Sequence, residues 1–135
     1  MKKNQKGFTL IELLVVIAII GILSTLDVIS LNNARQKARD AKMVSDIKSI
    51  QTALELYYND YNSYPFAAGA GNLPTSIGSG TQVYMQQVPN DPAGVPYTYH
   101  ATGTPATTYD IPFTLNGQAG NLAGGIHSAS PGAVN

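Results

Sequence analysis

The chain has 135 residues, of which 44% are hydrophobic, with eight basic and eight acidic residues and no cysteine. This length suits one small domain with one additional element, and it leaves no room for two enzymatic domains. The balanced charge gives no overall electrostatic argument for nucleic acid or an acidic substrate as partner. Without cysteine, neither disulfides nor a thiolate zinc site can hold the folded part together, so packing must do so.

Residue types are distributed unevenly along the chain. Every lysine and arginine lies at or before Lys48, whereas all eight prolines lie at or after Pro65. Eleven of the thirteen glycines lie at or after Gly69. The chain therefore has two compositional halves.

The first half begins with a long apolar segment. From Phe8 to Leu26, 19 residues, the only strongly polar side chain is Glu12, because Ser24 and Thr25 can return their hydroxyls to helix carbonyls. At about 1.5 Å per residue this segment spans about 28 Å, close to the hydrocarbon thickness of a bilayer. We therefore expect one membrane span. A cleaved secretory signal is the alternative, but the run is longer than a usual signal core and no small-x-small pattern closes it.

The Glu12 carboxylate is energetically unfavourable in such a segment. A carboxylate in lipid costs on the order of 2.5 to 3.5 kcal/mol on the lenient insertion scale, so a partner is expected. Between Gly7 and Gln36 the only cationic side chain is Arg35, far along the helix. If the chain were cut before Phe8, the new α-amino group would be able to pair with Glu12 of another copy. The other explanation is a protonated Glu12 that the bilayer tolerates.

The stretch KGFTLIELLVVIAIIGIL, residues 6–23, resembles the prepilin signature of type IV pilins and the related pseudopilins. Gly7, Phe8 and Glu12 occupy the positions of the last leader residue, the first mature residue and the glutamate of that signature. The resemblance implies cleavage by a prepilin peptidase between Gly7 and Phe8 and methylation of the Phe8 amine. It also implies that Glu12 pairs with the Phe8 amine of a neighbouring subunit.

Beyond Leu26 the pattern becomes amphipathic. Apolar residues recur three or four positions apart, as along one helix face, at Leu31, Ala34, Ala38, Ala41, Val44, Ile47, Ile50, Leu54, Tyr57 and Tyr61. No proline or glycine lies between Ile22 and Tyr64, so we expect one helix from about Phe8 to about Asn62, roughly 80 Å long. Asp40 and Asp46 alternate with basic residues, which is typical of a solvated helix face and not of a DNA-binding one.

Aromatic residues crowd the end of this helix. Tyr57, Tyr61, Tyr64 and Phe66 are predicted to be core residues, because helical spacing hides the rings while hydroxyls reach water. Tyr58 lies off the apolar stripe and is expected to be the most exposed of them. Pro65 then disfavours helical geometry at Tyr64 and stops the helix.

Three short stretches in the second half are typical of strands: TQVYMQQV, PYTYHA and TYDIPFTL. They predict a small antiparallel sheet in which Val83 with Met85, and Tyr97 with Tyr99, face the helix. Pro112 places the third stretch at an edge or a bulge. Asn116–Gly117 is the strongest turn signal in the chain, and the remainder is predicted to be a weakly ordered tail.

The stretches YNDYNSYP and VPNDPAGVPYTY resemble those of the major pseudopilins of type II secretion systems. Many of those pseudopilins bind calcium near the C-terminus, but Asp91 and Asp110 are the only acids after Asp60, so no metal or other cofactor is predicted here. His100 and His127 are the only imidazoles, and neither belongs to a catalytic constellation. We expect His100 to be a solvent-facing strand residue and the chain not to be an enzyme.

Together these features predict an α+β, pilin-like fold: a long helix packed on a small antiparallel sheet. We expect a leader over residues 1–7, a membrane-spanning and filament-core helix over 8–26, its amphipathic continuation over 27–63, and a β-rich region with flexible loops and tail over 64–135.

The predicted function is that of a structural subunit of a type IV pilus or a type II secretion pseudopilus. By the resemblance, its partners are other copies of itself, the prepilin peptidase, an inner-membrane assembly platform, minor pilins or pseudopilins, and membrane lipid; no specific nucleic acid is expected. The N-terminus is then cytoplasmic, the chain crosses the inner membrane once, and the assembled filament is periplasmic or at the cell surface. The alternative is a monomeric, membrane-anchored extracytoplasmic binding module, which would need neither Gly7, Phe8 nor Glu12.

Overall fold

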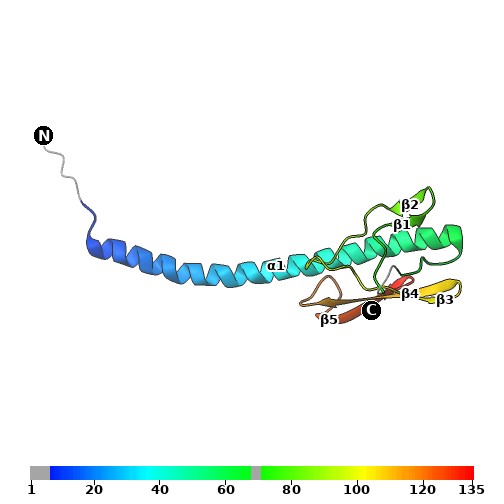
Figure 1. The fold of residues 1–135 in the computed structure, drawn as a ribbon. Coiled ribbons are helices and arrows are strands. Elements are labelled where there is room, and N and C mark those ends of the chain that lie inside the picture. Colours follow the sequence, from blue (N-terminus) through cyan, green and yellow to red (C-terminus); the bar gives the residue numbers. More distant parts are fainter. Residues whose placement is uncertain (1–6, 68–70) are drawn as a thin grey trace. The chain divides into compact units, whose positions relative to one another are not determined.

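The computed structural model describes residues 7–67 and 71–135 and has the predicted α+β architecture. One helix is followed by six strands (Figure 1): α1 (Leu10–Tyr61), β1 (Ile77–Ser79), β2 (Gln82–Met85), β3 (His100–Gly103), β4 (Ala106–Leu115), β5 (Gly125–Ser130) and β6 (Ala133–Val134). The chain divides into two compact units, one ending at Arg35 and the other Gln36–Asn135. The basic leader residues 1–6 lie outside the described residues.

In the first unit, α1 leaves its apolar side chains uncovered. Each large apolar side chain from Leu10 to Leu23 is at least 46% exposed. An 18-residue window of α1 near the N-terminus has a mean hydropathy of 2.5, enough for a membrane span. The Ser24 hydroxyl donates to the Ile20 carbonyl and the Thr25 hydroxyl to the Ile22 carbonyl, both at 2.7 Å, which confirms that neither hydroxyl needs water.

The second unit contains two antiparallel sheets, one of β1 and β2 and one in the order β3-β4-β5-β6. β2 and β4 confirm two of the predicted strands, whereas β1 was not predicted. The prediction of a weakly ordered tail was wrong, because β5 and β6 form there and pair with each other. The helix stabilises this end: the Gln51 side-chain amide donates to the carbonyls of Ser130 and Ala133, each at 2.9 Å.

Pro112 lies in an inner strand and still has an edge environment. The first part of β4 pairs with β3 up to the His100–Asp110 pair, and the part from Ile111 onward pairs with β5. Pro112 pairs with β5 alone, because β3 no longer pairs with β4 at this position. The N–H that proline lacks is therefore not missed by β3. Pro112 therefore has the edge environment that was predicted, although β4 as a whole is an inner strand of the sheet.

The core lies between the second half of α1 and the four-stranded sheet (Figure 1). The helix contributes fully buried Ile47, Ile50 and Leu54, as its periodicity predicts, while Tyr99 and Ile111 are fully buried across from them. Val83 was predicted to face the helix, but it is 48% exposed, because the short β1–β2 pair buries only Ile77 completely.

The helix ends one residue earlier than expected. Asn62 adopts φ 50° and its N–H donates to the Tyr58 carbonyl at 2.8 Å, a left-handed termination that asparagine tolerates. The chain then turns back, and the Tyr64 N–H donates to the Ala106 carbonyl at 2.8 Å. Tyr64 is thereby buried as predicted.

The other aromatic predictions at this end were partly wrong. Phe66 is 65% exposed and Tyr61 is 41% exposed, although the Tyr61 hydroxyl donates to the Ser79 carbonyl at 3.3 Å. Tyr58 is half-buried because its ring stacks on Tyr64, with centroids 4.6 Å apart.

Asp40 corrects the prediction of a wholly solvated charged face. It is 0% exposed, and its carboxylate accepts the Gly117 N–H at 2.7 Å, the Asn116 N–H at 3.3 Å and the Gln36 side-chain amide at 3.0 Å. Asp46 does behave as predicted, since it pairs with Lys42 on the helix surface at 2.6 Å. Asp40 therefore ties the start of the β4–β5 connection to α1.

Replacing Asp40 with alanine is expected to lower the free energy of unfolding of the second unit by about 2 to 3 kcal/mol, because two backbone N–H groups lose a charged acceptor. Asp46→Ala is the matched control and should cost under about 1 kcal/mol, since its i,i+4 partner Lys42 is 55% exposed and solvent weakens a pair with such a cation. Urea unfolding followed by near-ultraviolet circular dichroism measures both, and equal losses would contradict the anchoring role.

Buried tyrosines make the second unit sensitive to alkali. Burial raises the pKa of Tyr109 to about 12 and raises those of Tyr97 and Tyr99 well above their ordinary value. Because the folded pKa exceeds the unfolded one, this stabilisation is complete below about pH 10 and is lost as the pH rises through about 12. Tyr109→Phe should reduce the slope of unfolding free energy against pH above 10; an unchanged slope would contradict this account.

Candidate functional site

The predicted site residues lie at the beginning of α1. Thr9 precedes the helix, and its N–H and hydroxyl both donate to one oxygen of the Glu12 carboxylate, at 2.8 and 2.7 Å. The Glu12 N–H is 3.3 Å from the Thr9 hydroxyl oxygen in return. This is a capping box, in which Ser or Thr and a Glu three residues later satisfy each other's backbone groups. The T-x-x-E spacing of Thr9 and Glu12 is the signal of this cap in the sequence.

Glu12 lies in an apolar neighbourhood. It shares a shallow surface hollow of about 390 Å³ with Phe8, Ile11, Val15 and Val16. Phe8 is 86% exposed. Among residues 7–67 and 71–135, no basic side chain forms an ion pair with Glu12, so any cationic partner comes from outside the described chain.

Gly7 has no structural reason to be glycine within this part of the chain. A Cβ built on it would meet no atom within 4 Å, and its φ is not in the left-handed region. At Gly117, by contrast, a Cβ would lie 3.3 Å from the Asp40 carboxylate. The small residue at position 7 is therefore not required by folding.

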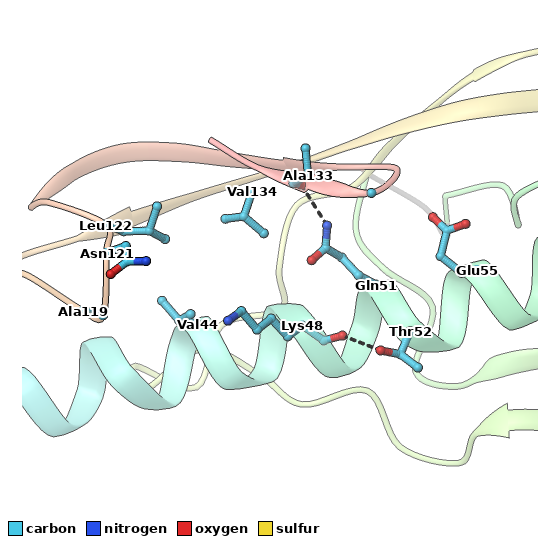
Figure 2. A pocket seen from close by; sticks show the side chains of 12 residues that line it. Val44, Lys48, Gln51, Thr52, Glu55, Ala119, Asn121, Leu122, Ala133 and Val134 are labelled. Atoms are coloured by element: carbon cyan, nitrogen blue, oxygen red, sulfur yellow. Dashed lines mark hydrogen bonds between the residues drawn. The ribbon is translucent and has the colours of Figure 1, made fainter.

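A groove of about 600 Å³ lies in the second unit, between α1 and two connections of the sheet (Figure 2). Its apolar lining comes from Val44, Ala119, Leu122 and Val134, and its charged lining from Lys48 and Glu55. Glu55 accepts the Tyr64 hydroxyl at 3.0 Å. No serine, cysteine or histidine is among the residues that line this groove.

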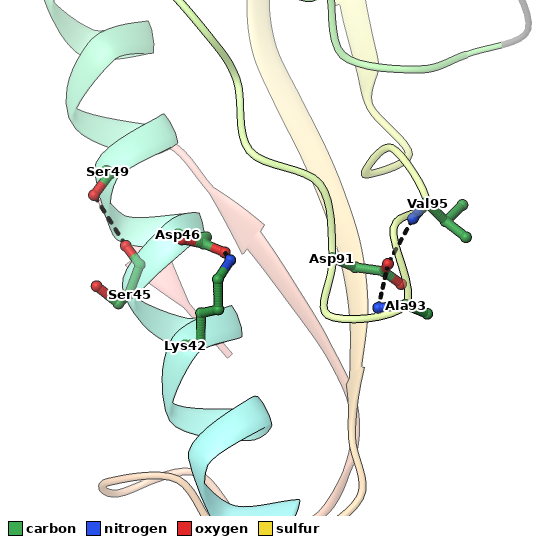
Figure 3. Close-up of polar contacts among 7 residues, drawn as sticks. All are labelled: Lys42, Ser45, Asp46, Ser49, Asp91, Ala93 and Val95. Atoms are coloured by element: carbon green, nitrogen blue, oxygen red, sulfur yellow. Dashed lines mark hydrogen bonds and ion pairs between the residues drawn. The ribbon is translucent and has the colours of Figure 1, made fainter. Parts of the chain in front are cut away.

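Asp91 closes a tight turn (Figure 3). Its carboxylate accepts the N–H groups of Ala93 and Val95 at 2.9 and 2.7 Å, and Gly94 has φ 86°. These bonds show that the Asp-Pro-x-Gly-x-Pro-Tyr sequence of residues 91–97 forms a turn.

In residues 71–135, the acidic side chains do not form a metal site. The Asp110 carboxylate accepts the Ser128 hydroxyl, and the described residues contain no group of three or more His, Cys, Asp or Glu positioned to hold a metal ion.

The two histidines occupy separate places. His100 is an exposed residue of β3, as predicted. His127 in β5 stacks on Phe113, and its ring nitrogens lie 2.7 Å from the Ala123 carbonyl and 3.0 Å from the Asn135 carbonyl. Both positions are structural.

Comparison with known families agrees with this arrangement. Residues 2–26 match the prokaryotic N-terminal methylation motif, and residues 30–129 match the family described as type II secretion system (T2SS), protein G. The chain belongs to the type II secretion system protein G family. This is a family of structural pseudopilin subunits, so the chain is not an enzyme.

Individual relatives share most of their length with the chain. The type II secretion system core protein G of Aeromonas hydrophila is 36% identical over 127 residues, covering 88% of this chain and 89% of the relative. That of Dickeya chrysanthemi is 31% identical and covers 97% and 100%, and that of Escherichia coli K12 is 38% identical over 70% of each. No solved structure matched significantly.

The capping box predicts a local effect. Thr9→Val removes the hydroxyl that bonds Glu12 and should destabilise the first helical turn by about 1 kcal/mol, as for other lost N-caps. Amide hydrogen exchange at Glu12 and Leu13, measured in micelles, should accelerate severalfold. Thr25→Val, whose hydroxyl bonds the Ile22 carbonyl, is the control and should leave both amides unchanged.

Proposed function

We propose that this pseudopilin is made as a membrane-stored precursor, cleaved between Gly7 and Phe8, methylated on the Phe8 amine, and polymerised into a type II secretion pseudopilus through Glu12. The observation that carries the proposal is the uncovered apolar surface of α1 from Leu10 to Leu23 with one carboxylate in its first turn. A surface of this kind needs lipid first and other helices afterwards.

The size of that surface supports an obligatory partner. Each large apolar side chain there is at least 46% exposed, and full burial of such a side chain contributes about 1.5 to 3 kcal/mol. The bilayer supplies this cover for the stored subunit. In a filament, neighbouring helices supply it, with van der Waals packing in place of lipid contact.

Glu12 has the bonding capacity that intersubunit pairing requires. One carboxylate oxygen receives both bonds from Thr9, and no bond within the described chain occupies the other oxygen. An ammonium group of a second copy is able to bind there without breaking the helix cap. Such a charge-assisted bond in an apolar, water-free setting is strong enough to fix the axial position of one subunit on the next.

Gly7 supports processing by an external enzyme. Since nothing in the described chain restricts the side chain at position 7, the requirement for a small residue belongs to the peptidase that reads it. Cleavage there releases the amine of Phe8, one residue before the capping residue Thr9. We propose that this amine pairs with the Glu12 carboxylate of another copy.

For the orientation, we propose that the N-terminus is cytoplasmic, the segment from Phe8 to Leu26 spans the inner membrane, and the region from residue 27 on is periplasmic. The partners are other copies of the chain, the prepilin peptidase, the inner-membrane assembly platform and minor pseudopilins. Residues 1–7 are the leader, 8–26 the filament-core helix, 27–63 its continuation and 64–135 the globular region.

Two variants test this proposal. Gly7→Val should leave the precursor uncut, so that intact mass and N-terminal sequencing of the chain from its native membrane find no methylated Phe8. Glu12→Ala should be cut normally and yield no sedimentable filaments. An uncut wild-type chain, or filaments that survive the loss of Glu12, would favour the monomeric membrane-anchored module instead.

Glu12→Gln separates the two roles of this side chain. Glutamine still completes the capping box but carries no charge for the neighbouring amine. If pairing drives assembly, filaments are lost in the Gln variant as in the Ala variant. If helix capping is the whole role of Glu12, the Gln variant assembles like wild type.

A further inference from the structure

The peptide between Asn116 and Gly117 is held in an unusual position. The Gly117 N–H donates to the fully buried Asp40 carboxylate at 2.7 Å, and the Asn116 N–H lies 3.3 Å from the other carboxylate oxygen. Gly124 also packs closely on this peptide, since a Cβ added to it would lie 3.4 Å from the Gly117 Cα. The backbone is thus fixed between α1 and the end of its own connection.

Asn116 is the only asparagine in the sequence that glycine follows. In an asparagine–glycine pair, rotation of the asparagine side chain can bring its amide carbon to the next backbone nitrogen, where closure gives a cyclic imide. Glycine has no Cβ to obstruct that approach. The nitrogen in question is the one whose hydrogen Asp40 accepts.

We propose that Asn116 is a site of spontaneous deamidation in the folded chain and that Asp40 is its general base. The Gly117 nitrogen attacks the Asn116 side-chain amide carbon, and its proton passes to Asp40. The bond from that carbon to the amide nitrogen breaks, and ammonia leaves with the proton from Asp40. Water then opens the cyclic imide, leaving aspartate or isoaspartate at position 116.

Three features of the site support this reaction. Asp40 is 0% exposed, none of the basic residues in residues 7–67 and 71–135 forms an ion pair with it, and the Gly117 N–H has one of its carboxylate oxygens while the Asn116 N–H and the Gln36 amide share the other. Asn116 is exposed, and no hydrogen bond within the same residues holds its side chain, which is free to rotate toward the nitrogen. Gly117 permits the close approach, because a Cβ there would crowd the carboxylate.

The product changes the same contact. The backbone N–H of residue 116 is 3.3 Å from the buried Asp40 carboxylate, so a carboxylate at position 116 adds a like charge near this contact, and like charges repel. The connection that follows contributes Ala119 and Leu122 to the groove on α1. Deamidation is therefore expected to loosen the connection and remove part of the groove wall, which makes it a slow, irreversible change in the subunit surface.

The test follows the full-length chain in micelles at neutral pH by intact mass and peptide mapping over time. Asp40→Asn keeps the size and one oxygen acceptor but removes the base, and it should slow conversion at Asn116 by roughly tenfold or more, since positioned bases commonly contribute at least that much. Asp46→Asn, an equal charge loss on the same helix, should leave the rate unchanged. Conversion of Asn121, which lies in the same connection and is not followed by glycine, gives the rate of deamidation without these features.

A second measurement does not depend on the variant folding. Wild-type chain in urea loses the contact with Asp40, so conversion at Asn116 should be slower there than in the native state. Equal or faster conversion in urea, or in a folded Asp40→Asn variant, would overturn the proposal and show that the structure protects this peptide instead.

Discussion

One constraint dominates this molecule: a single helix must satisfy two different surroundings. Up to Leu23 its apolar side chains are exposed on all sides, and from Ile47 to Leu54 one stripe is fully buried against a sheet. A helix is the only element that crosses from lipid to water without exposing backbone polar groups in the apolar part. The first part therefore depends on membrane and then on neighbouring copies, while the second part carries its own core.

The second unit depends on side chains of α1 that reach across to backbone groups of the sheet connections. Gln51 bonds the carbonyls at the β5–β6 turn, and Asp40 bonds the amides at the start of the β4–β5 connection. The paired strands β4 and β5 are thus bonded to α1 at both ends of their ladder. A packed apolar core alone would leave the position of the sheet along the helix less well defined, whereas these directional bonds fix it.

The sequence revealed the helix, its burial stripe and two of the strands, because these follow from periodicity and from proline positions. It did not reveal β5 and β6, since the Gly- and Ser-rich composition there is typical of loops and the strands contact partners far away in sequence, among them Gln51. Asp40 was misjudged for the same reason: its spacing among basic residues fits a solvated face, and only the fold brings Asn116 and Gly117 to it. Glu12 was predicted to need a partner, and its local bond to Thr9 was overlooked.

The bonds from Gln51 join residues 79 and 82 positions apart in the chain. Contacts of such high sequence separation form late, because the intervening chain must be ordered first. Residues up to Ala133 must therefore leave the ribosome before the sheet can close on its helix, and the apolar segment, which comes earlier in the chain, leaves before them. The apolar segment is therefore available to a membrane while the sheet is still unfolded.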